Sequence, residues 1–301
     1  MNNVKEIVNS LRKGDFKSLA RAITIVENEL AGYEEILLSL NSGATIPIIG
    51  ITGPPGAGKS TLINSVVGHL IAQKKRIAIV AVDPTSPFNY GSLLGDRLRL
   101  SEFFNHPDVF IRSLASRGSL GGLSEKIIEV TDVLRQSNFD YIFVETVGVG
   151  QSEVEIAGLA DTTVVVFVPE SGDDIQTMKS GIMEIADIYV VNKCDREGAD
   201  RFAVNLQHLI HDKKREEWAV PVVRTSALNK EGVDELVMQI DKHHKENTAN
   251  QKKIFLLTEK AYRLLQRERM RGVSKVHIYE KLSAHEKEAD FNLYKFVKSL
   301  A

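Results

Sequence analysis

Gly53-Pro54-Pro55-Gly56-Ala57-Gly58-Lys59-Ser60-Thr61 fits the pattern G-x-x-x-x-G-K-[ST] at every fixed position. Such a stretch wraps backbone N–H groups around a polyphosphate, and Gly56 and Gly58 allow backbone geometry that a Cβ would obstruct. We expect Lys59 to lie against the β- and γ-phosphates and the Ser60 hydroxyl to coordinate Mg²⁺. The sequence therefore predicts a phosphate-binding loop whose residues, Gly53 to Thr61, contact a nucleotide.

The sequence on either side supplies the elements that such a loop requires. Thr45–Thr52 is short and apolar, like a buried strand. Ser60–Gln73 follows, and its apolar residues stand at helical spacing. A helix beginning at the loop would add its positive N-terminal end to the phosphate site. The alternative, a chance match in a Gly-rich turn, does not account for strand, loop and helix in this order.

Composition and charge argue against several classes of protein. The 301 residues, 43% of them hydrophobic, suffice for one large domain with appendages or for two smaller domains. A net charge of −2 without a long basic run argues against general nucleic-acid binding. The single cysteine, Cys194, excludes an intramolecular disulfide framework. No signal peptide and no apolar run of the about 20 residues that span a bilayer is visible, so we expect a cytoplasmic protein without membrane contact.

Apolar runs alternate with helical patterns from residue 45 onward. The runs lack period-two alternation, which is typical of strands covered on both faces. They are Ile46–Thr52, Arg76–Val82, Val109–Ser113, Tyr141–Val147, Thr162–Pro169, Ile188–Asn192 and Pro221–Thr225. We therefore predict an α/β fold of the P-loop NTPase type, a doubly wound and mostly parallel sheet with ligand groups at the carboxyl ends of its strands.

Helical segments precede and follow the sheet in the sequence. The chain is therefore predicted to have three regions: a helical extension at 1–43, a nucleotide-binding domain at 44–248 and a helical region at 249–301. The first region carries an apolar stripe from Phe16 to Leu30, with Gly32 as a helix stop. It either covers the main core or binds a partner. The last region is predicted to form two helices, and one interpretation is that they fold back on the sheet.

Carboxylates follow two of the predicted strands. Asp83 comes directly after the second strand and could hold Mg²⁺, or it could form an Asx turn before Pro84. Asp96, in the polar loop that follows, is a second candidate ligand or a solvated turn residue. Glu145 ends an apolar strand, and Gly148 comes three residues later. In P-loop NTPases such a carboxylate orients the Mg²⁺ shell and such a glycine N–H senses the γ-phosphate, although a structural role for Glu145 remains open.

The sixth strand ends in Asn192-Lys193-Cys194-Asp195, an N-K-x-D pattern that reads guanine. The Asp195 carboxylate can accept hydrogen bonds from guanine N1–H and the 2-amino group, which adenine does not offer in that arrangement. The Lys193 stem can lie along the base, and Asn192 can hold this loop to the phosphate loop. The seventh strand is followed by Ser226-Ala227-Leu228, where a backbone N–H such as that of Ala227 can meet guanine O6.

These motifs together resemble the methylmalonyl-CoA mutase-associated GTPases, a family also labelled lysine/arginine/ornithine transport ATPases of the ArgK type. The resemblance covers nearly the whole chain. It is carried by Gly53–Thr61, Val82-Asp83-Pro84, Gly95-Asp96-Arg97, Glu145-Thr146-Val147-Gly148-Val149-Gly150-Gln151-Ser152-Glu153, Asn192–Asp195 and Lys260-Ala261-Tyr262…Arg269-Met270-Arg271.

The resemblance implies a homodimeric GTPase that acts as chaperone for an adenosylcobalamin-dependent acyl-CoA mutase, gating cofactor loading and protecting the mutase. It implies that Ser60, Asp83, Asp96 and Glu145 form the Mg²⁺-linked set. It also implies an extra switch loop at 172–179, whose Lys179 would communicate the nucleotide state to the mutase. The tail would form the dimer contacts.

We therefore predict Mg²⁺-dependent hydrolysis of GTP to GDP and phosphate, with Lys59, Glu145, Gly148 and Lys179 as the residues closest to the chemistry. Two alternatives remain open. One is a GTPase that inserts nickel into enzymes, although such proteins usually bring a His-rich tract or paired cysteines. The other is a transport-associated ATPase or kinase, against which Asn192–Asp195 argues.

Overall fold

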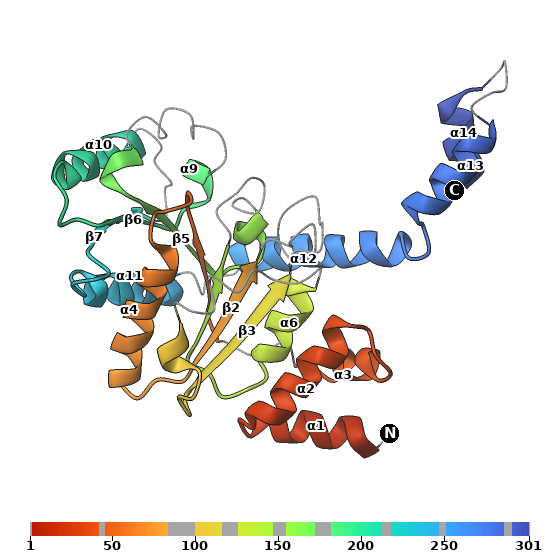
Figure 1. The fold of residues 1–301 in the computed structure, drawn as a ribbon, viewed down its shortest axis with the longest axis horizontal. Coiled ribbons are helices and arrows are strands. Elements are labelled where there is room, and N and C mark those ends of the chain that lie inside the picture. The colour runs from red at the N-terminus through yellow and green to blue at the C-terminus, as the bar shows by residue number, and fades with distance from the viewer. Residues whose placement is uncertain are drawn as a thin grey trace. The chain divides into compact units, whose positions relative to one another are not determined.

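The computed structural model is built around one seven-stranded sheet in which all strands are parallel, with the order β3-β2-β4-β1-β5-β6-β7 (Figure 1). It describes residues 2–41, 46–83, 100–115, 126–146, 155–171, 182–211, 218–246, 251–285 and 291–300. The predicted α/β fold with a parallel sheet is confirmed.

Every predicted strand is present, and each described end lies within two residues of the expected position. The bounds are β1 Ile48–Thr52, β2 Ile77–Asp83, β3 Val109–Ala115, β4 Tyr141–Glu145, β5 Thr162–Phe167, β6 Ile188–Asn192 and β7 Val222–Thr225. The strands β1, β4, β5 and β6 are buried along their whole length, as their continuous apolar sequences predict.

Helices cover both faces of the sheet. Helix α4 (Lys59–Ala72) and helix α11 (Val233–Glu246) share one apolar core with alternate residues of β1, β2, β4, β5 and β6. Helix α10 (Ala199–His211) packs on the opposite face, against the other residues of β5 and β6. Figure 1 shows α6 (Ile127–Leu134) on the side of the sheet away from α4. The shorter elements are η1 Ser101–Phe103, η2 Ile156–Gly158, η3 Pro169–Ser171 and α9 Ile182–Ile185.

The central strand β1 pairs with β4 on one side and with β5 on the other. The chain therefore leaves β1 toward one half of the sheet and later builds the other half, which makes the carboxyl end of β1 a topological switch point. Ligands of doubly wound sheets bind in the crevice at such a point. The loop that begins at Gly53 directly follows β1, so this topology places it there.

The N-terminal region folds into three helices, and one predicted boundary is wrong. They are α1 (Asn2–Arg12), α2 (Phe16–Glu27) and α3 (Tyr33–Leu38). We expected Gly32 to end the second helix, but Asn28 caps it by donating its N–H to Thr24 O at 3.2 Å. Gly32 instead precedes α3 with φ of 93°, and an added Cβ would lie 2.7 Å from Val4 Cγ2. The glycine thus serves a close turn between helices.

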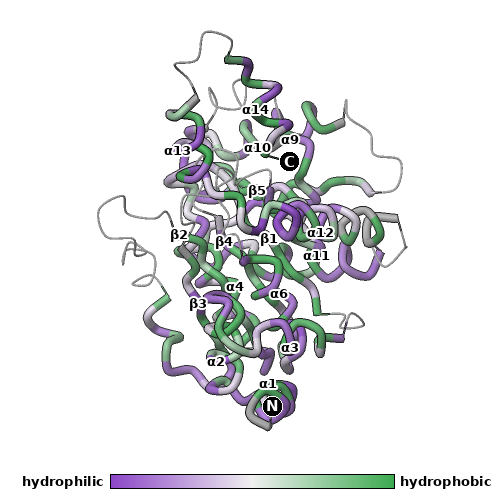
Figure 2. Tube along the Cα trace, turned by 90° about the vertical axis from the view of Figure 1, so that its right-hand side faces the viewer, coloured by the Kyte–Doolittle hydropathy of each residue, from purple (hydrophilic) through white to green (hydrophobic). Residues whose placement is uncertain are grey.

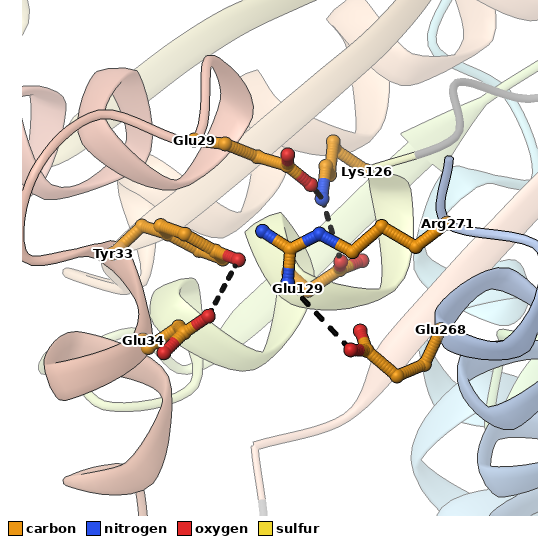
Figure 3. Close-up of polar contacts among 7 residues, drawn as sticks. All are labelled: Glu29, Tyr33, Glu34, Lys126, Glu129, Glu268 and Arg271. Atoms are coloured by element: carbon orange, nitrogen blue, oxygen red, sulfur yellow. Dashed lines mark hydrogen bonds and ion pairs between the residues drawn. The ribbon is translucent and has the colours of Figure 1, made fainter.

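Ion pairs and hydrogen bonds fasten these helices to the main unit. Lys126, just before α6, binds Glu29 and also Glu129 at 3.4 Å (Figure 3). Arg112 of β3 binds Glu27, and Gln136 exchanges two hydrogen bonds of 3.0 and 2.9 Å with the backbone of Asn41. These contacts attach the N-terminal helices to the sheet and to α6, which is compatible with the interpretation that they cover the main core.

The chain divides into two compact units, residues 1–256 and 257–301, and the second is helical. The tail was expected to hold two helices, but its described residues form three: α12 (Gln251–Arg269), α13 (Lys275–His285) and α14 (Leu293–Leu300). Helix α13 was not predicted because its apolar residues do not share one face, and Figure 2 shows it as a mixture of hydrophilic and hydrophobic residues. None of the helices that the structure describes combines the length and apolar character needed to cross a membrane.

Candidate functional site

Three glycines give the loop after β1 its shape, because each adopts a positive φ: 138° at Gly53, 78° at Gly56 and 83° at Gly58. A Cβ on Gly53 would lie 2.2 Å from Val166 O, and one on Gly58 would lie 2.5 Å from the amide nitrogen of Asn192. The loop is therefore pressed against β5 and β6, and only glycine fits at these two positions.

Helix α4 begins at Lys59, one residue earlier than predicted, so its N-terminal end points into the loop. The Lys59 side chain is buried, and its Nζ donates to Gly53 O at 2.8 Å and to Pro54 O at 3.1 Å. The ammonium group thus lies inside the ring of the loop, where successive N–H groups and a helix N-terminus also favour anions. Pro55 and Gly56 form the exposed rim.

The predicted metal ligands are brought together in part. The Ser60 hydroxyl donates to Glu145 Oε1 at 2.6 Å, and the two residues are only 3% and 6% exposed. Two oxygen ligands converge here beside the phosphate loop, and Mg²⁺ prefers oxygen ligands, so these residues fit the ion. Asp83 ends β2, which runs beside β4 with Ala81 opposite Glu145, but its side chain lies outside the described part.

Three further predicted site residues, Asp96, Gly148 and Lys179, lie outside the described residues. The structure therefore gives no geometry for them, and their roles stay predictions.

The buried side chain of Asn192 joins three segments of the candidate base site. Its amide nitrogen donates to Ala57 O at 2.9 Å. Its amide oxygen accepts from the Thr225 hydroxyl at 3.1 Å and from the Ala227 N–H at 3.2 Å. The ends of β6 and β7 are thereby held against the phosphate loop, as expected for Asn192 from the sequence.

Lys193 and Asp195 lie on the same loop. Lys193 has φ of 58°, and its Nζ donates to Gly56 O at 2.9 Å. The Asp195 carboxylate accepts from the Ser226 hydroxyl at 2.6 Å, and this hydrogen bond lowers the pKa of Asp195 below its usual value. The carboxylate is thus ionised at neutral pH and ready to accept donors. Leu228, after Ala227, is 84% exposed.

Cys194, at the free position of the motif, is not set up as a nucleophile. Partial burial and the nearby carboxylate of Glu231 raise the pKa of its thiol. Because the thiolate is the reactive form, the raised pKa disfavours reactivity at this position.

Several hydroxyl groups around the site were not predicted from the sequence. Thr225 binds Asn192, and the buried Ser65 of α4 binds Ala227 O. Thr52 and Thr146, at the ends of β1 and β4, bind each other at 2.9 Å. The available signal was a Ser or Thr beside each motif, but the sequence did not reveal which strand ends are neighbours.

Known structures and proteins resemble this chain over most of its length. The crystal structure of a LAO/AO transport system kinase matches 99% of this chain and 96% of its own, with a TM-score of 0.73 and 25% identity. A Pyrococcus abyssi protein named "Putative GTPase" is 48% identical over 80% of this chain and 76% of its own length. The GTPase ArgK of Escherichia coli is 37% identical over 77% of this chain and 73% of its own.

The family comparison agrees with the motifs at the carboxyl edge of the sheet. The family model described as methylmalonyl Co-A mutase-associated GTPase MeaB matches residues 19–283, which include the phosphate loop, the Glu145 strand end and the Asn192–Asp195 loop. The match begins in α2 and ends in α13, so it extends beyond the sheet at both ends. The resemblance inferred from the sequence is thereby confirmed, and the chain belongs to the MeaB family of methylmalonyl-CoA mutase-associated GTPases.

Proposed function

We propose that this protein hydrolyses GTP to GDP and phosphate with Mg²⁺. The observation that carries the proposal is the attachment of the guanine-reading loop to the phosphate loop. Asn192 binds Ala57 O at 2.9 Å and Lys193 binds Gly56 O at 2.9 Å, so Asp195 stands at a fixed place relative to Lys59 and Ser60. One ligand that carries both a guanine base and a polyphosphate accounts for both loops.

Base selectivity follows from the chemistry of Asp195. Its carboxylate is an acceptor of hydrogen bonds, and guanine presents N1–H and a 2-amino group as a matching pair of donors. Adenine presents no such pair, so bound ATP would leave the Asp195 carboxylate without hydrogen-bond donors from the base. ATP would therefore bind more weakly than GTP. Ser226 keeps this carboxylate ionised and oriented.

The phosphate end supplies positioning and positive charge. Lys59 and the N-terminal end of α4 stabilise negative charge on the transferred phosphoryl group. Ser60 and Glu145 would hold Mg²⁺, with Asp83 and Asp96 as further members of the set, and the ion would neutralise charge on the phosphate oxygens. Gly148 would contact the γ-phosphate through its N–H. No arginine finger or general base is identified among the described residues, so we expect slow intrinsic turnover.

We further propose that the client is an adenosylcobalamin-dependent acyl-CoA mutase, whose cofactor loading this GTPase gates and which it protects. The name of the family supports a mutase as the client. Lys179 would pass the nucleotide state to the mutase. A nickel-insertion role or a transport ATPase role would be the alternatives if no mutase responds.

A homodimer is part of the same proposal, with region 1–43 as a helical extension, 44–248 as the GTPase domain and 249–301 as the dimerisation region. Large apolar side chains of the second unit are about half exposed or more, as expected of a surface that a second chain covers. They include Leu257, Tyr262, Leu265, Val276, Tyr279, Leu293, Tyr294 and Val297.

The test measures GTP and ATP turnover, and GDP affinity, with and without a purified adenosylcobalamin-dependent mutase from the same organism. Hydrolysis of GTP but not of ATP, at a rate that the mutase increases, supports both the GTPase and the mutase parts of the proposal. Hydrolysis of GTP without acceleration would retain the GTPase and remove this client, and a preference for ATP would contradict the role of Asp195. Lys179→Ala should keep GTP affinity within about twofold while it weakens the acceleration.

A further inference from the structure

Two threonines meet at the centre of the sheet, between the phosphate loop and the acidic strand end. Thr52 is the last residue of β1 and directly precedes Gly53, and Thr146 directly follows Glu145. The Thr146 hydroxyl donates to the Thr52 hydroxyl at 2.9 Å. The two residues are 0% and 1% exposed, so neither hydroxyl is in reach of bulk water.

A buried hydroxyl pair of this kind fixes the backbone on both sides. Leaving one hydroxyl without its partner in a buried site is unfavourable, so each threonine holds the other in place. The Thr146 N–H also donates to Ile51 O at 3.1 Å, which extends the β1–β4 ladder by one residue. The residue directly after Glu145 therefore makes two hydrogen bonds to β1, one through its hydroxyl and one through its N–H, and these bonds restrict the position of Glu145.

The chain returns to β1 a short distance later. Ile156, in η2, is fully buried and packs so closely on β1 that a Cβ added to Gly50 would lie 2.4 Å from its Cγ1. The same Cβ would lie 3.0 Å from Ala160 Cβ. Thr52 of β1 thus holds the chain at Thr146, and Gly50 of β1 packs against Ile156. The same strand leads into the phosphate loop.

We propose that Thr52 and Thr146 are positioning residues for GTP hydrolysis, and that their hydroxyl pair holds the Glu145 carboxylate against Ser60. This inference rests on the proposed GTPase function. The pair acts through Glu145, because the described contacts of the two hydroxyls run to each other rather than into the phosphate loop. It connects the two motifs that hold the metal and the phosphates, which are far apart in the sequence.

The experiment uses Thr146→Val, which keeps the shape and removes the hydroxyl, and Thr146→Ser, which keeps the hydroxyl and removes the methyl group. We expect Thr146→Val to lower kcat about tenfold, with KM for GTP changed by less than about twofold, because loss of one buried hydrogen bond is of that size. The Mg²⁺ concentration for half-maximal binding of a non-hydrolysable GTP analogue should rise. Thr146→Ser should restore both quantities.

A double-mutant cycle with Thr52→Val tests the pair itself by denaturant unfolding. The double variant should be no less stable than either single variant, because it removes both hydroxyls and leaves none unmatched. Additive losses, or a Thr146→Val variant with unchanged kcat and unchanged Mg²⁺ dependence, would overturn the positioning role. A wild-type protein that hydrolyses no GTP would contradict the proposed function, whereas the Mg²⁺ dependence of analogue binding would still decide the role of the threonines.

Discussion

The two edges of the sheet use carboxylates in different ways. At the amino edge, Asp140, Asp161 and Asp187 each stand one residue before a strand, β4, β5 and β6. Each accepts a hydrogen bond from a backbone N–H. The donor to Asp140 is Arg76 N at 2.8 Å, the donor to Asp161 is Ile48 N at 2.8 Å, and the donor to Asp187 is Thr163 N at 2.9 Å. Each also meets a basic side chain: Lys75, Arg135 and His243, respectively.

At the carboxyl edge, Glu145 is the last residue of β4 and Asp195 lies in the loop after β6, and each accepts a hydrogen bond from a serine hydroxyl. A hydroxyl can rotate to another partner, whereas a backbone N–H at the start of a strand cannot. We therefore expect the amino-edge carboxylates to stabilise the fold and the carboxyl-edge carboxylates to bind the proposed nucleotide and its metal ion. Substitutions at the amino edge should therefore change the free energy of unfolding, and substitutions at the carboxyl edge should change nucleotide affinity.

The largest expected effect is at Asp187, which is 2% exposed and lies 3.5 Å from the ring of the buried His243. Asp187→Ala should lower the free energy of unfolding by about 3 kcal/mol, because buried hydrogen-bond donors lose their acceptor. GTP affinity should change by less than about twofold. Denaturant unfolding can be followed by the fluorescence of Trp218, the single tryptophan, whose Nε1 donates to Asp187 O at 2.8 Å.

The matched control is Asp187→Asn, which keeps an acceptor for the Thr163 N–H and should cost less than the alanine variant. A loss below about 1 kcal/mol in Asp187→Ala, or a parallel loss of GTP affinity, would contradict the assignment of the amino edge to stability.

Asp195→Ala should show the opposite behaviour. The side chain is exposed to solvent, so the unfolding temperature should stay the same, while GTP affinity should fall about 10²-fold through loss of charge-assisted hydrogen bonds to guanine. Titration calorimetry with GDP and with ADP measures the affinities for the guanine and the adenine nucleotide. Asp140→Ala is the control from the amino edge, and it should lower stability and leave GDP affinity intact. An equal loss for adenine and guanine nucleotides would refute base reading by Asp195.

Ser226→Ala sharpens the carboxyl-edge assignment through pH. The Ser226 hydroxyl lowers the pKa of Asp195, so the carboxylate stays ionised as the pH falls through the ordinary range of aspartate, about pH 4. Removal of the hydroxyl raises that pKa, and the loss of GDP affinity on acidification should then begin at higher pH. At neutral pH we expect a loss of about tenfold, because the carboxylate is no longer oriented.

The measurement is GDP affinity from neutral to mildly acidic pH, in wild type and in Ser226→Ala. Ser226→Thr keeps a hydroxyl and should follow the wild-type profile. Superimposable profiles for wild type and Ser226→Ala would show that this hydrogen bond does not tune Asp195.

Much of this molecule was predictable from sequence because its signals are local. The phosphate loop, the seven apolar strands and the Asn192–Asp195 loop each depend on residues that are adjacent in the chain. Helix α13 was missed because its apolar residues do not form one stripe, and Gly32 was misjudged because a glycine can begin a helix as well as end one.

The partners of the site residues were not predictable for a different reason. Thr52 and Thr146 are 94 residues apart and meet only because β4 inserts beside β1 in the strand order. Likewise, the aspartates before β4, β5 and β6 reach N–H groups of segments that are neighbours in space alone. Sequence patterns locate strand ends, but only the sheet order says which ends share a hydrogen bond.

The smallest expected effect is at Tyr141, the first residue of β4, whose hydroxyl donates to Asp241 of α11 at 2.7 Å. Tyr141→Phe should lower the free energy of unfolding by about 1 kcal/mol at neutral pH, through loss of this hydrogen bond. Burial, with a further contribution from Asp241, raises the pKa of Tyr141, so the phenol stays neutral in the folded protein.

The pH dependence follows from that raised pKa. In the unfolded chain the phenol ionises near its usual value of about 10, while in the folded chain it does not. The stabilisation from Tyr141 is therefore fully present below that pH and is lost as the pH rises above it. The stability difference between wild type and Tyr141→Phe should shrink above about pH 10, and GDP affinity should be the same in both because the residue lies at the amino edge. A difference that stays constant into the alkaline range would show that the folded protein ionises Tyr141 as readily as the unfolded chain does.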